Sequence, residues 1–323
     1  MSEKMAQTLP LRYYSTVTAK EVNWLWYPYI PFGKITIIQG DPGDGKTTLV
    51  LNIASLLSVG CSMPDTDIEI EPMKIIYQSA EDGAEDTIKP RLISAGADCT
   101  RIAFIDDSIQ GLTLNSTRIE SAITEMNAKL LVIDPLQAFL GESGEMNRAD
   151  GIRPLMKHLT TVADRTGCAI VIVGHMNKSS SSKGIYRGLG SIDITAAARS
   201  VLLVGKLKND PSVRVMAQIK NSLAEEGKPI AFEINEQSKV RWIGGYDVTA
   251  DEVLGGEEPQ NDQSRLSEAV EALKSILSDG AMPCIQIYEK LHELDISKRS
   301  ADRAKKILNI KSNKHSDGWY WSL

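Results

Sequence analysis

The segment from Gly40 to Leu49 reads GDPGDGKTTL, in which glycine, lysine and threonine have the spacing GxxxxGKT. Apolar runs on either side, ITIIQ and LVLNIASLL, predict a strand before it and a helix after it. Backbone N–H groups of such a loop, together with the helix N-terminus, surround anionic phosphates. The segment therefore predicts a site for ATP and Mg²⁺; the alternative is a plain glycine turn.

Within this loop, Lys46 is expected to reach the β- and γ-phosphates, and Thr47 is expected to bind Mg²⁺. The full set of residues predicted to contact the nucleotide is Gly40, Asp41, Pro42, Gly43, Asp44, Gly45, Lys46, Thr47 and Thr48.

A second acidic position follows the apolar run KLLVID, which ends at Asp134. An aspartate at the end of a buried strand can hold the magnesium ion through water, although it can also simply cap a loop. No glutamate follows Asp134, so the catalytic base is expected on another strand.

The stretch KIIYQSAEDGAEDTIKPRL supplies a candidate for that base. Glu81 comes just after the run KIIYQ, which we expect to form a strand beside that of the phosphate loop. From there its carboxylate could orient the attacking water. Asp82 is the rival, and either residue could instead cap a helix.

A third strand-like run, AIVIVG, leads into HMNKSSSSKGIYRGLGS. In an open parallel sheet the functional surface is the carboxyl edge of the strands, which is where His175 is expected to emerge. The segment beyond it carries Lys178, Lys183 and Arg187 among hydroxyls, amides and glycines. Such groups bind a phosphodiester backbone without reading its sequence, so this segment is a candidate for single-stranded DNA binding. Alternatively, it is a surface loop and His175 an ordinary buried histidine.

The elements that position these residues are strands alternating with helix-like segments. The apolar, strand-like runs are ITIIQ, KIIYQ, RIAFID, KLLVID, AIVIVG and SVLLVG. Separated by 20 to 40 residues, they predict an α/β core with a mostly parallel sheet covered by helices on both faces. The more closely spaced runs VRVMAQI, IAFEI and VRWIG predict antiparallel strands that extend the sheet.

After an acidic, turn-rich stretch the sequence predicts three helices and a hairpin, which together indicate a winged helix. Seven cations lie between residues 296 and 315, opposed only by Asp302. A basic third helix suits duplex phosphates, and Lys298, Arg299, Arg303 and Lys306 are the predicted contacts. A protein-docking winged helix is the alternative. The predicted organisation is an N-terminal segment 1–23, a core 24–246, a linker 247–263 and a winged helix 264–323.

The composition sets limits on the protein's surroundings. A net charge of -6 over 323 residues argues against a uniformly basic nucleic-acid coat, although local patches remain possible. The four cysteines stand singly, which fits a reducing compartment and buried apolar positions rather than disulfides. No signal peptide opens the chain and no apolar run is long enough to span a membrane. We therefore expect a soluble, cytoplasmic protein without a membrane partner.

The motifs occur in an order that resembles the RepA-like family of RecA-superfamily P-loop ATPases, which includes hexameric replicative helicases of plasmids. The resemblance covers residues 24–234 and five motifs: WLWYPYIPFGKITIIQGDPGDGKTTL, SAEDGAEDTIKPRLISAGAD, VIDPLQAFLG, VGHMNK and RGLGSIDITAAARSVLLV.

The resemblance implies a RecA-like core that assembles into a ring, most simply a hexamer, with the loop after His175 lining a DNA channel. It assigns the catalytic glutamate to Glu81, the metal aspartate to Asp134 and γ-phosphate sensing to His175. The arginine inserted into a neighbouring subunit's site falls on Arg199. Where DnaB-like relatives have Lys-x-Arg, this chain has Lys220 followed by asparagine and serine, so only Lys220 could act in trans.

The leading prediction is an ATP-driven, ring-forming DNA translocase or replicative helicase of phage or plasmid type. A second prediction is an ATP-gated recombination mediator, helicase loader or replication regulator that does not unwind DNA. A third is a signalling ATPase that does not bind DNA.

Overall fold

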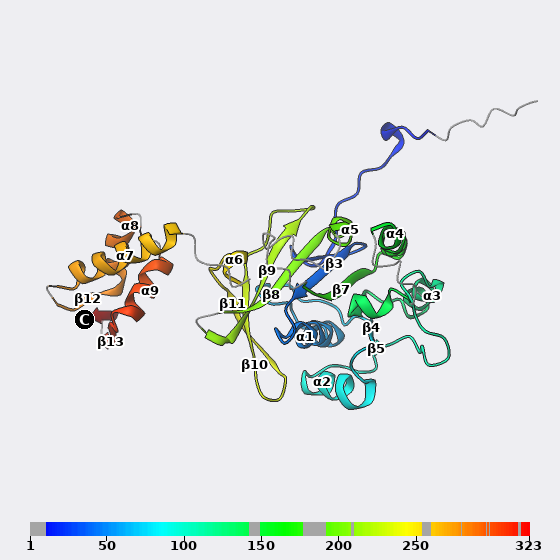
Figure 1. Cartoon of the computed structure of the whole chain (residues 1–323), viewed down its shortest axis with the longest axis horizontal. Helices are drawn as coiled ribbons and strands as arrows, with labels where there is room; N and C mark the ends of the chain where they lie inside the picture. Colours follow the sequence, from blue (N-terminus) through cyan, green and yellow to red (C-terminus); the bar gives the residue numbers. More distant parts are fainter. Residues whose placement is uncertain are drawn as a thin grey trace, which may run out of the picture.

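The computed structural model describes residues 11–141, 149–176, 192–207, 210–253, 260–278, 280–294, 296, 298–315 and 318–323. Figure 1 shows an α/β part formed by β1 to α6 and a smaller part formed by α7 to β14. Among the described residues, the α/β part contains two clusters of buried apolar side chains, and the smaller part contains a third.

One sheet of the α/β part contains nine strands of the described chain, in the order β11-β10-β9-β8-β3-β7-β6-β4-β5. The strands from β8 to β5 run parallel, whereas β9, β10 and β11 extend the sheet in antiparallel fashion. Their bounds are β3 Ile35–Gly40, β4 Ile75–Ser79, β5 Ile102–Ala103, β6 Leu130–Asp134, β7 Ala169–His175, β8 Ser200–Leu207, β9 Asp210–Asn221, β10 Ile230–Ile234 and β11 Val240–Gly245. The predicted α/β fold with a mostly parallel sheet is confirmed.

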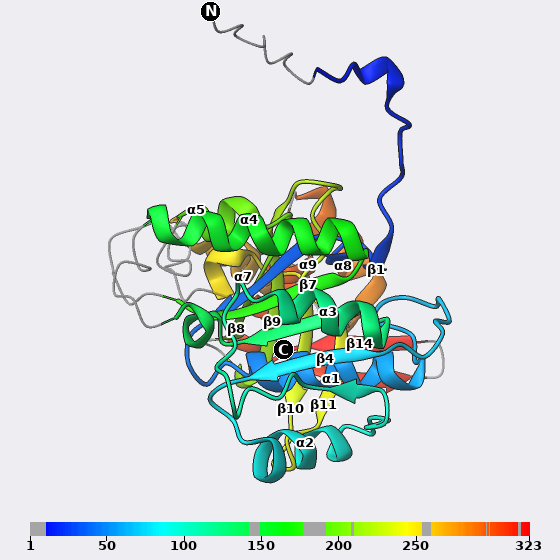
Figure 2. The same cartoon turned by 90° about the vertical axis from the view of Figure 1, so that its right-hand side faces the viewer.

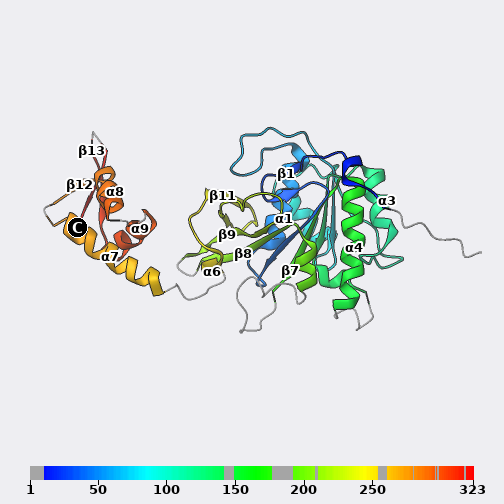
Figure 3. The same cartoon turned by 90° about the horizontal axis from the view of Figure 1, so that it is seen from above.

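Helices cover both faces of this sheet, and Figures 2 and 3 show α1 and α4 on opposite sides. On one face lie α1 (Lys46–Val59), the π-helical turn η2 (Ala84–Ile88) and α2 (Lys89–Ser94). On the other lie α3 (Thr117–Met126), η3 (Leu136–Phe139), α4 (Ala149–Thr166) and α5 (Ile192–Ala197).

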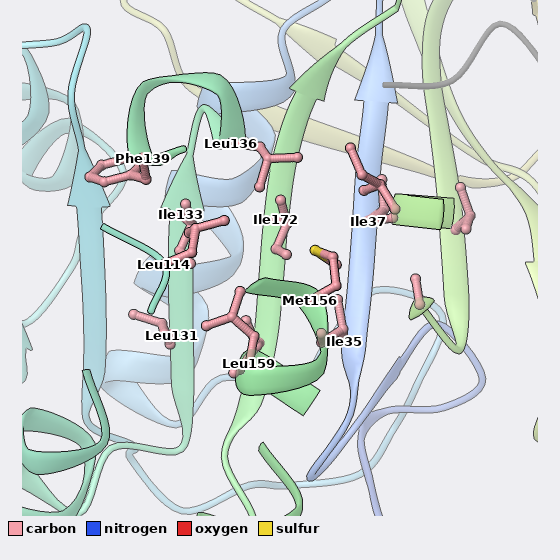
Figure 4. Packing of buried hydrophobic residues seen from close by; sticks show 14 of the residues in the cluster. Ile35, Ile37, Leu114, Leu131, Ile133, Leu136, Phe139, Met156, Leu159 and Ile172 are labelled. Carbon is pink, nitrogen blue, oxygen red and sulfur yellow. The ribbon is translucent and has the colours of Figure 1, made fainter. Parts of the chain in front are cut away.

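The core explains why the central strands β3, β6 and β7 are mainly apolar and almost wholly buried. Ile37 and Ile172 on β3 and β7 are fully buried and lie with Met156 and Leu159 of α4 (Figure 4). Ile38 points to the other face, into the cluster that contains α1. Burial of one such side chain contributes about 1.5–3 kcal/mol, so continuous apolar runs stabilise strands that are covered on both sides.

The strand order corrects one prediction. β4, which leads to Glu81, does not lie beside the phosphate-loop strand β3; it pairs with β5 and β6. The neighbours of β3 are β7 and β8. A hydrophobic pattern reports burial of a strand but carries no information about which buried strand lies next to it.

The stretch predicted as a linker is partly structured. α6 (Ala250–Val253) packs on β8, where a Cβ atom added to Gly205 would lie 2.7 Å from Val253 Cγ1. Helix α7 (Gln260–Ile276) begins before the predicted start of the winged helix at residue 264. Residues 250–253 therefore pack with the α/β core.

The C-terminal part contains α7, α8 (Cys284–Glu293) and α9 (Lys298–Ile307), as the sequence predicts. The hairpin of β13 (Lys311–His315) and β14 (Gly318–Ser322) is joined by an unpredicted strand, β12 (Met282–Pro283). Trp321 is buried with Leu273 and Ile287, and its ring lies 4.2 Å from Lys305 Nζ.

The N-terminal residues from 11 to 23 contain one short turn, η1 (Tyr14–Thr16), and extend away from the sheet (Figures 1 and 2). They lead into a two-stranded pair, β1 (Trp24–Trp26) and β2 (Ile30–Pro31). Among the described residues, no helix is both long enough and apolar enough to cross a bilayer.

The cysteines whose surroundings are described are unpaired, but only one fits the prediction of burial. Cys168 is buried, Cys99 is partly exposed and Cys61 is exposed. Burial raises the pKa of the Cys168 thiol to about 12.

Candidate functional site

The phosphate loop joins the end of β3 to the start of α1, as the sequence predicts. Gly43 and Gly45 have φ angles of +84° and +90°, in the region that favours glycine. A Cβ atom at Gly45 would also lie 2.5 Å from Ile234 Cδ1 and 3.1 Å from Arg214 Nε. Glycine is therefore favoured at position 45 by its backbone conformation, and a larger residue would also have to displace side chains of β9 and β10.

Lys46 is the first residue of α1 and is only 4% exposed. Its ammonium group donates to the carbonyl oxygens of Gly40, at 3.0 Å, and Asp41, at 2.8 Å. Burial lowers the pKa of Lys46, while the negative charges of Asp44 and Asp134 oppose that shift. The Lys46 ammonium group thus lies against the backbone of the phosphate loop, where the phosphates of a nucleotide are expected to bind.

Asp134 ends β6 and meets the predicted metal-binding hydroxyl. Thr47 Oγ1 donates to Asp134 Oδ2 at 2.8 Å, across 87 residues of sequence. Burial raises the pKa of the Asp134 carboxyl, and its hydrogen bonds oppose that shift. Carboxylate and hydroxyl oxygens are suitable ligands for Mg²⁺, and here they adjoin the N-terminus of α1, so the residues present fit a magnesium nucleotide.

Tyr77 on β4 is a site residue that the sequence did not predict. Its hydroxyl donates to the same Asp134 Oδ2 at 2.7 Å. The sequence signal is weak: a tyrosine follows two isoleucines in β4, and its partner lies 57 residues away.

Glu81 and His175 come together although their strands do not adjoin. The distance from His175 Nε2 to Glu81 Oε2 is 3.9 Å; the His175 side chain is partly exposed and that of Glu81 is exposed. His175 is paired in register with Gly40, directly beside the start of the phosphate loop. Asp82 instead accepts a hydrogen bond from Arg91 Nη1 at 3.0 Å, so Glu81 is the better placed of the two candidates for the base.

Arg199 and Lys220 lie at the opposite edge of the sheet. The Arg199 N–H donates to the Ile35 carbonyl at the start of β3, and Lys220 is paired with Val201 at the start of β8. Lys220 Nζ donates to the Thr195 carbonyl at 2.8 Å. At about 3.3 Å per residue, the length of β3 separates this edge from the phosphate loop by roughly 16 Å. Neither cation is therefore grouped with the phosphate loop of its own chain.

Some predicted DNA contacts lie outside the described part of the chain. These are Lys178, Lys183 and Arg187, together with the side chains of Lys298 and Arg299. Both Arg303 and Lys306 lie on α9; Arg303 is partly buried and Lys306 is exposed. Their role in DNA binding stays a prediction.

The parallel sheet, the phosphate loop and the convergence of Lys46, Thr47 and Asp134 define a P-loop ATPase of the RecA superfamily. The chain belongs to the AAA_25 family, described as an AAA domain, whose profile matches residues 4–181.

Curated relatives of the chain are named DNA repair protein RadA. The protein from Bacillus subtilis is 24% identical over 228 residues, covering 69% of this chain and 44% of the relative. The protein from Halalkalibacterium halodurans is 29% identical over 222 residues, covering 67% and 42%. The chain thus spans less than half the length of these relatives.

Among solved structures, the chain is similar to the KaiC-like protein PH0186 of the archaeon Pyrococcus horikoshii. The identity is 20% and the TM-score is 0.48, over 66% of this chain and 90% of that one.

Proposed function

We propose that this protein is a homo-oligomeric, ring-forming ATPase that hydrolyses ATP and moves along single-stranded DNA, as a phage- or plasmid-type replicative helicase does. The observation that carries the proposal is a separation along strand β3. The cations Arg199 and Lys220 lie at the end where β3 begins. The proposed nucleotide site, formed by Lys46, Thr47, Asp134 and Glu81, lies at the end where β3 stops. A second copy that presents its amino-edge cations to the phosphate loop would complete the site.

Each residue then has a specific role in hydrolysis. Lys46 and the N–H groups at the start of α1 bind the β- and γ-phosphates, while Thr47 and Asp134 hold Mg²⁺. The bound ion would neutralise charge on the phosphates. Glu81 orients the attacking water, and His175 senses the γ-phosphate. Arg199, with Lys220 beside it, stabilises the charge of the transition state from the neighbouring subunit.

DNA is the proposed partner because two predicted basic regions suit phosphodiester backbones. One is the segment with Lys178, Lys183 and Arg187, which follows the strand end at His175. The other is helix α9. It lies in the C-terminal part of the chain, where three helices and a small antiparallel sheet support the proposal of a winged helix. The names of the curated relatives, DNA repair protein RadA, also favour DNA over a signalling partner.

The proposed domain organisation keeps a core, a short linker and a winged helix, with the core now extended to residue 253. The proposed site of action is the cytoplasm, where such DNA is found.

An ATP-gated mediator that does not unwind DNA is the second candidate, because the curated relatives are named as repair proteins. Strand displacement on a forked duplex separates the two. ATP-dependent displacement supports the helicase. DNA-stimulated hydrolysis without displacement supports the mediator, and hydrolysis that DNA leaves unchanged contradicts both.

The role of the basic segment is tested with the double variant Lys183→Ala, Arg187→Ala. We expect DNA stimulation of hydrolysis to be abolished while hydrolysis without DNA is retained. Unchanged stimulation would contradict the assignment of this segment to DNA.

The assembly is tested by measuring mass in solution with a non-hydrolysable ATP analogue and an oligonucleotide. A hexamer supports the ring, an open filament supports the mediator, and a monomer contradicts the role of Arg199 in trans.

A further inference from the structure

Two hydrogen bonds converge on a single oxygen of the proposed metal-binding carboxylate. Thr47 Oγ1 and the Tyr77 hydroxyl both donate to Asp134 Oδ2, at 2.8 and 2.7 Å. Within the described residues, no hydrogen bond reaches Oδ1. The carboxylate is therefore held through one oxygen, with the other left for a ligand.

The backbone fixes the reach of Tyr77. Its Cα is paired with Val132 across β4 and β6, two residues before Asp134, which is paired with Ser79. Two residues of strand span about 6.6 Å, close to the length of a tyrosine side chain, so the phenol reaches along the strand pair to the carboxylate. The ring is only 3% exposed and packs in the cluster that includes α1. Tyr77 thus has little freedom to turn away.

The two donors differ in their proposed relation to the metal ion. Thr47 is itself a proposed metal ligand: a lone pair of its hydroxyl oxygen can bind the ion while its O–H donates to Asp134. Tyr77 is fixed within the sheet and is not a proposed ligand. Its hydroxyl donates to Asp134 Oδ2 from a ring that is buried between the sheet and α1.

We propose that Tyr77 is a positioning residue that fixes the carboxylate of Asp134 for Mg²⁺ and keeps its hydrogen bond when the ion is bound. This inference rests on the proposed Thr47 and Asp134 magnesium site. Groups that orient metal ligands in this way typically change metal affinity by roughly 10- to 100-fold when they are removed.

The test is Tyr77→Phe, which removes the hydroxyl and retains the ring. Tyr29→Phe is the matched control, because Tyr29 is also buried and its hydroxyl donates to the Lys228 carbonyl at 2.6 Å, outside the phosphate site. Binding of a non-hydrolysable ATP analogue is measured by calorimetry over a series of Mg²⁺ concentrations and in EDTA. Thermal unfolding shows that each variant is folded.

We expect Tyr77→Phe to need more Mg²⁺ than the wild type. The Mg²⁺ concentration that gives half of the full increase in affinity for the ATP analogue should rise roughly 10- to 100-fold. Affinity in EDTA should be unchanged, and Tyr29→Phe should match the wild type in both conditions. An unchanged Mg²⁺ requirement in folded Tyr77→Phe overturns the role of Tyr77 and leaves the magnesium site intact. A wild type that gains no affinity from Mg²⁺ overturns the magnesium site itself, and with it this inference.

A second measurement tests whether Tyr77 acts through Asp134, and it adds a second substitution at residue 77. Asp134→Asn is compared with the double variant Asp134→Asn, Tyr77→Phe, and Tyr77→Trp is added as a bulkier substitution without the phenol. If Tyr77 acts through Asp134, its substitution adds no further change in Mg²⁺-dependent affinity once the carboxylate is gone. A further loss in the double variant would contradict the inference, as would normal Mg²⁺ dependence in Tyr77→Trp.

Discussion

At the scale of single residues, neighbours in sequence have different surroundings. Asp82 is engaged by Arg91, whereas Glu81 faces His175 at the carboxyl edge of the sheet. A side chain that holds an arginine is less free to orient a water molecule, so Glu81 is the candidate for the base.

Glu81→Gln should reduce ATP hydrolysis by about 10²- to 10⁴-fold because an amide cannot accept the proton of the attacking water. Nucleotide affinity should change little. Asp82→Asn is the control and should retain most of the activity. Steady-state hydrolysis and binding of an ATP analogue are the measurements; a larger loss in Asp82→Asn than in Glu81→Gln would reverse the assignment.

Lys220 provides a pH-dependent prediction. Burial, followed by the charge of Arg199, lowers the pKa of Lys220 below its usual value. In the window just below pH 10.5, the unfolded chain therefore binds more protons at this position than the folded one, so this contribution to stability increases as pH rises.

Arg199→Ala should raise the pKa of Lys220 toward its usual value, because it removes the second of these causes. An NMR titration of the lysine side chains in the variant and the wild type measures the change. A Lys220 pKa that stays the same or falls would contradict the proximity of the two cations.

At the scale of elements, the central strands β3, β6 and β7 were predictable because each is a mainly apolar run covered on both faces. The phosphate loop was predictable because its glycines, lysine and threonine have a fixed spacing within one segment. The order of the strands in the sheet was not predictable. The pairing of β4 with β6, and the contact of Tyr77 with Asp134, depend on chain crossovers that leave no local pattern. β12 was missed because it contains only two residues.

The packing of α6 on β8 leads to a prediction about stability. Gly205→Ala should cost about 1–3 kcal/mol because the new Cβ would lie 2.7 Å from both the carbonyl oxygen and Cγ1 of Val253. Gly111→Ala is the control, since nothing lies within 4 Å of a Cβ there. Urea unfolding compares the free energies of unfolding. Equal stability of the two variants would indicate that residues 250–253 do not pack on the core.

At the scale of the whole molecule, the charge is unevenly distributed. The chain carries a net charge of -6, yet α9 reads KRSADRAKKI and is strongly basic. A local positive face on an acidic protein can bind DNA at one place while the remainder is repelled.

Duplex binding through α9 should therefore depend on salt. Arg303→Ala with Lys306→Ala should reduce the slope of log affinity against log salt by about 0.9 for each DNA phosphate that the variant no longer neutralises. Fluorescence anisotropy of a labelled duplex, titrated with the full chain at several salt concentrations, gives the slope. The substitution Lys274→Ala on α7 is a control of the same charge type. An unchanged slope in the α9 variant would favour a protein-docking role for the C-terminal part.

The most direct test of the central claim, that the ATPase site is completed by a neighbouring copy, is hydrolysis by mixed subunits. Glu81→Gln retains Arg199 but lacks the base, whereas Arg199→Ala retains the base but lacks the trans cation. Each variant alone should be nearly inactive, and a mixture should recover hydrolysis because some interfaces combine an intact base with an intact arginine. A mixture no more active than the sum of its two components, although the subunits co-assemble, would contradict the claim.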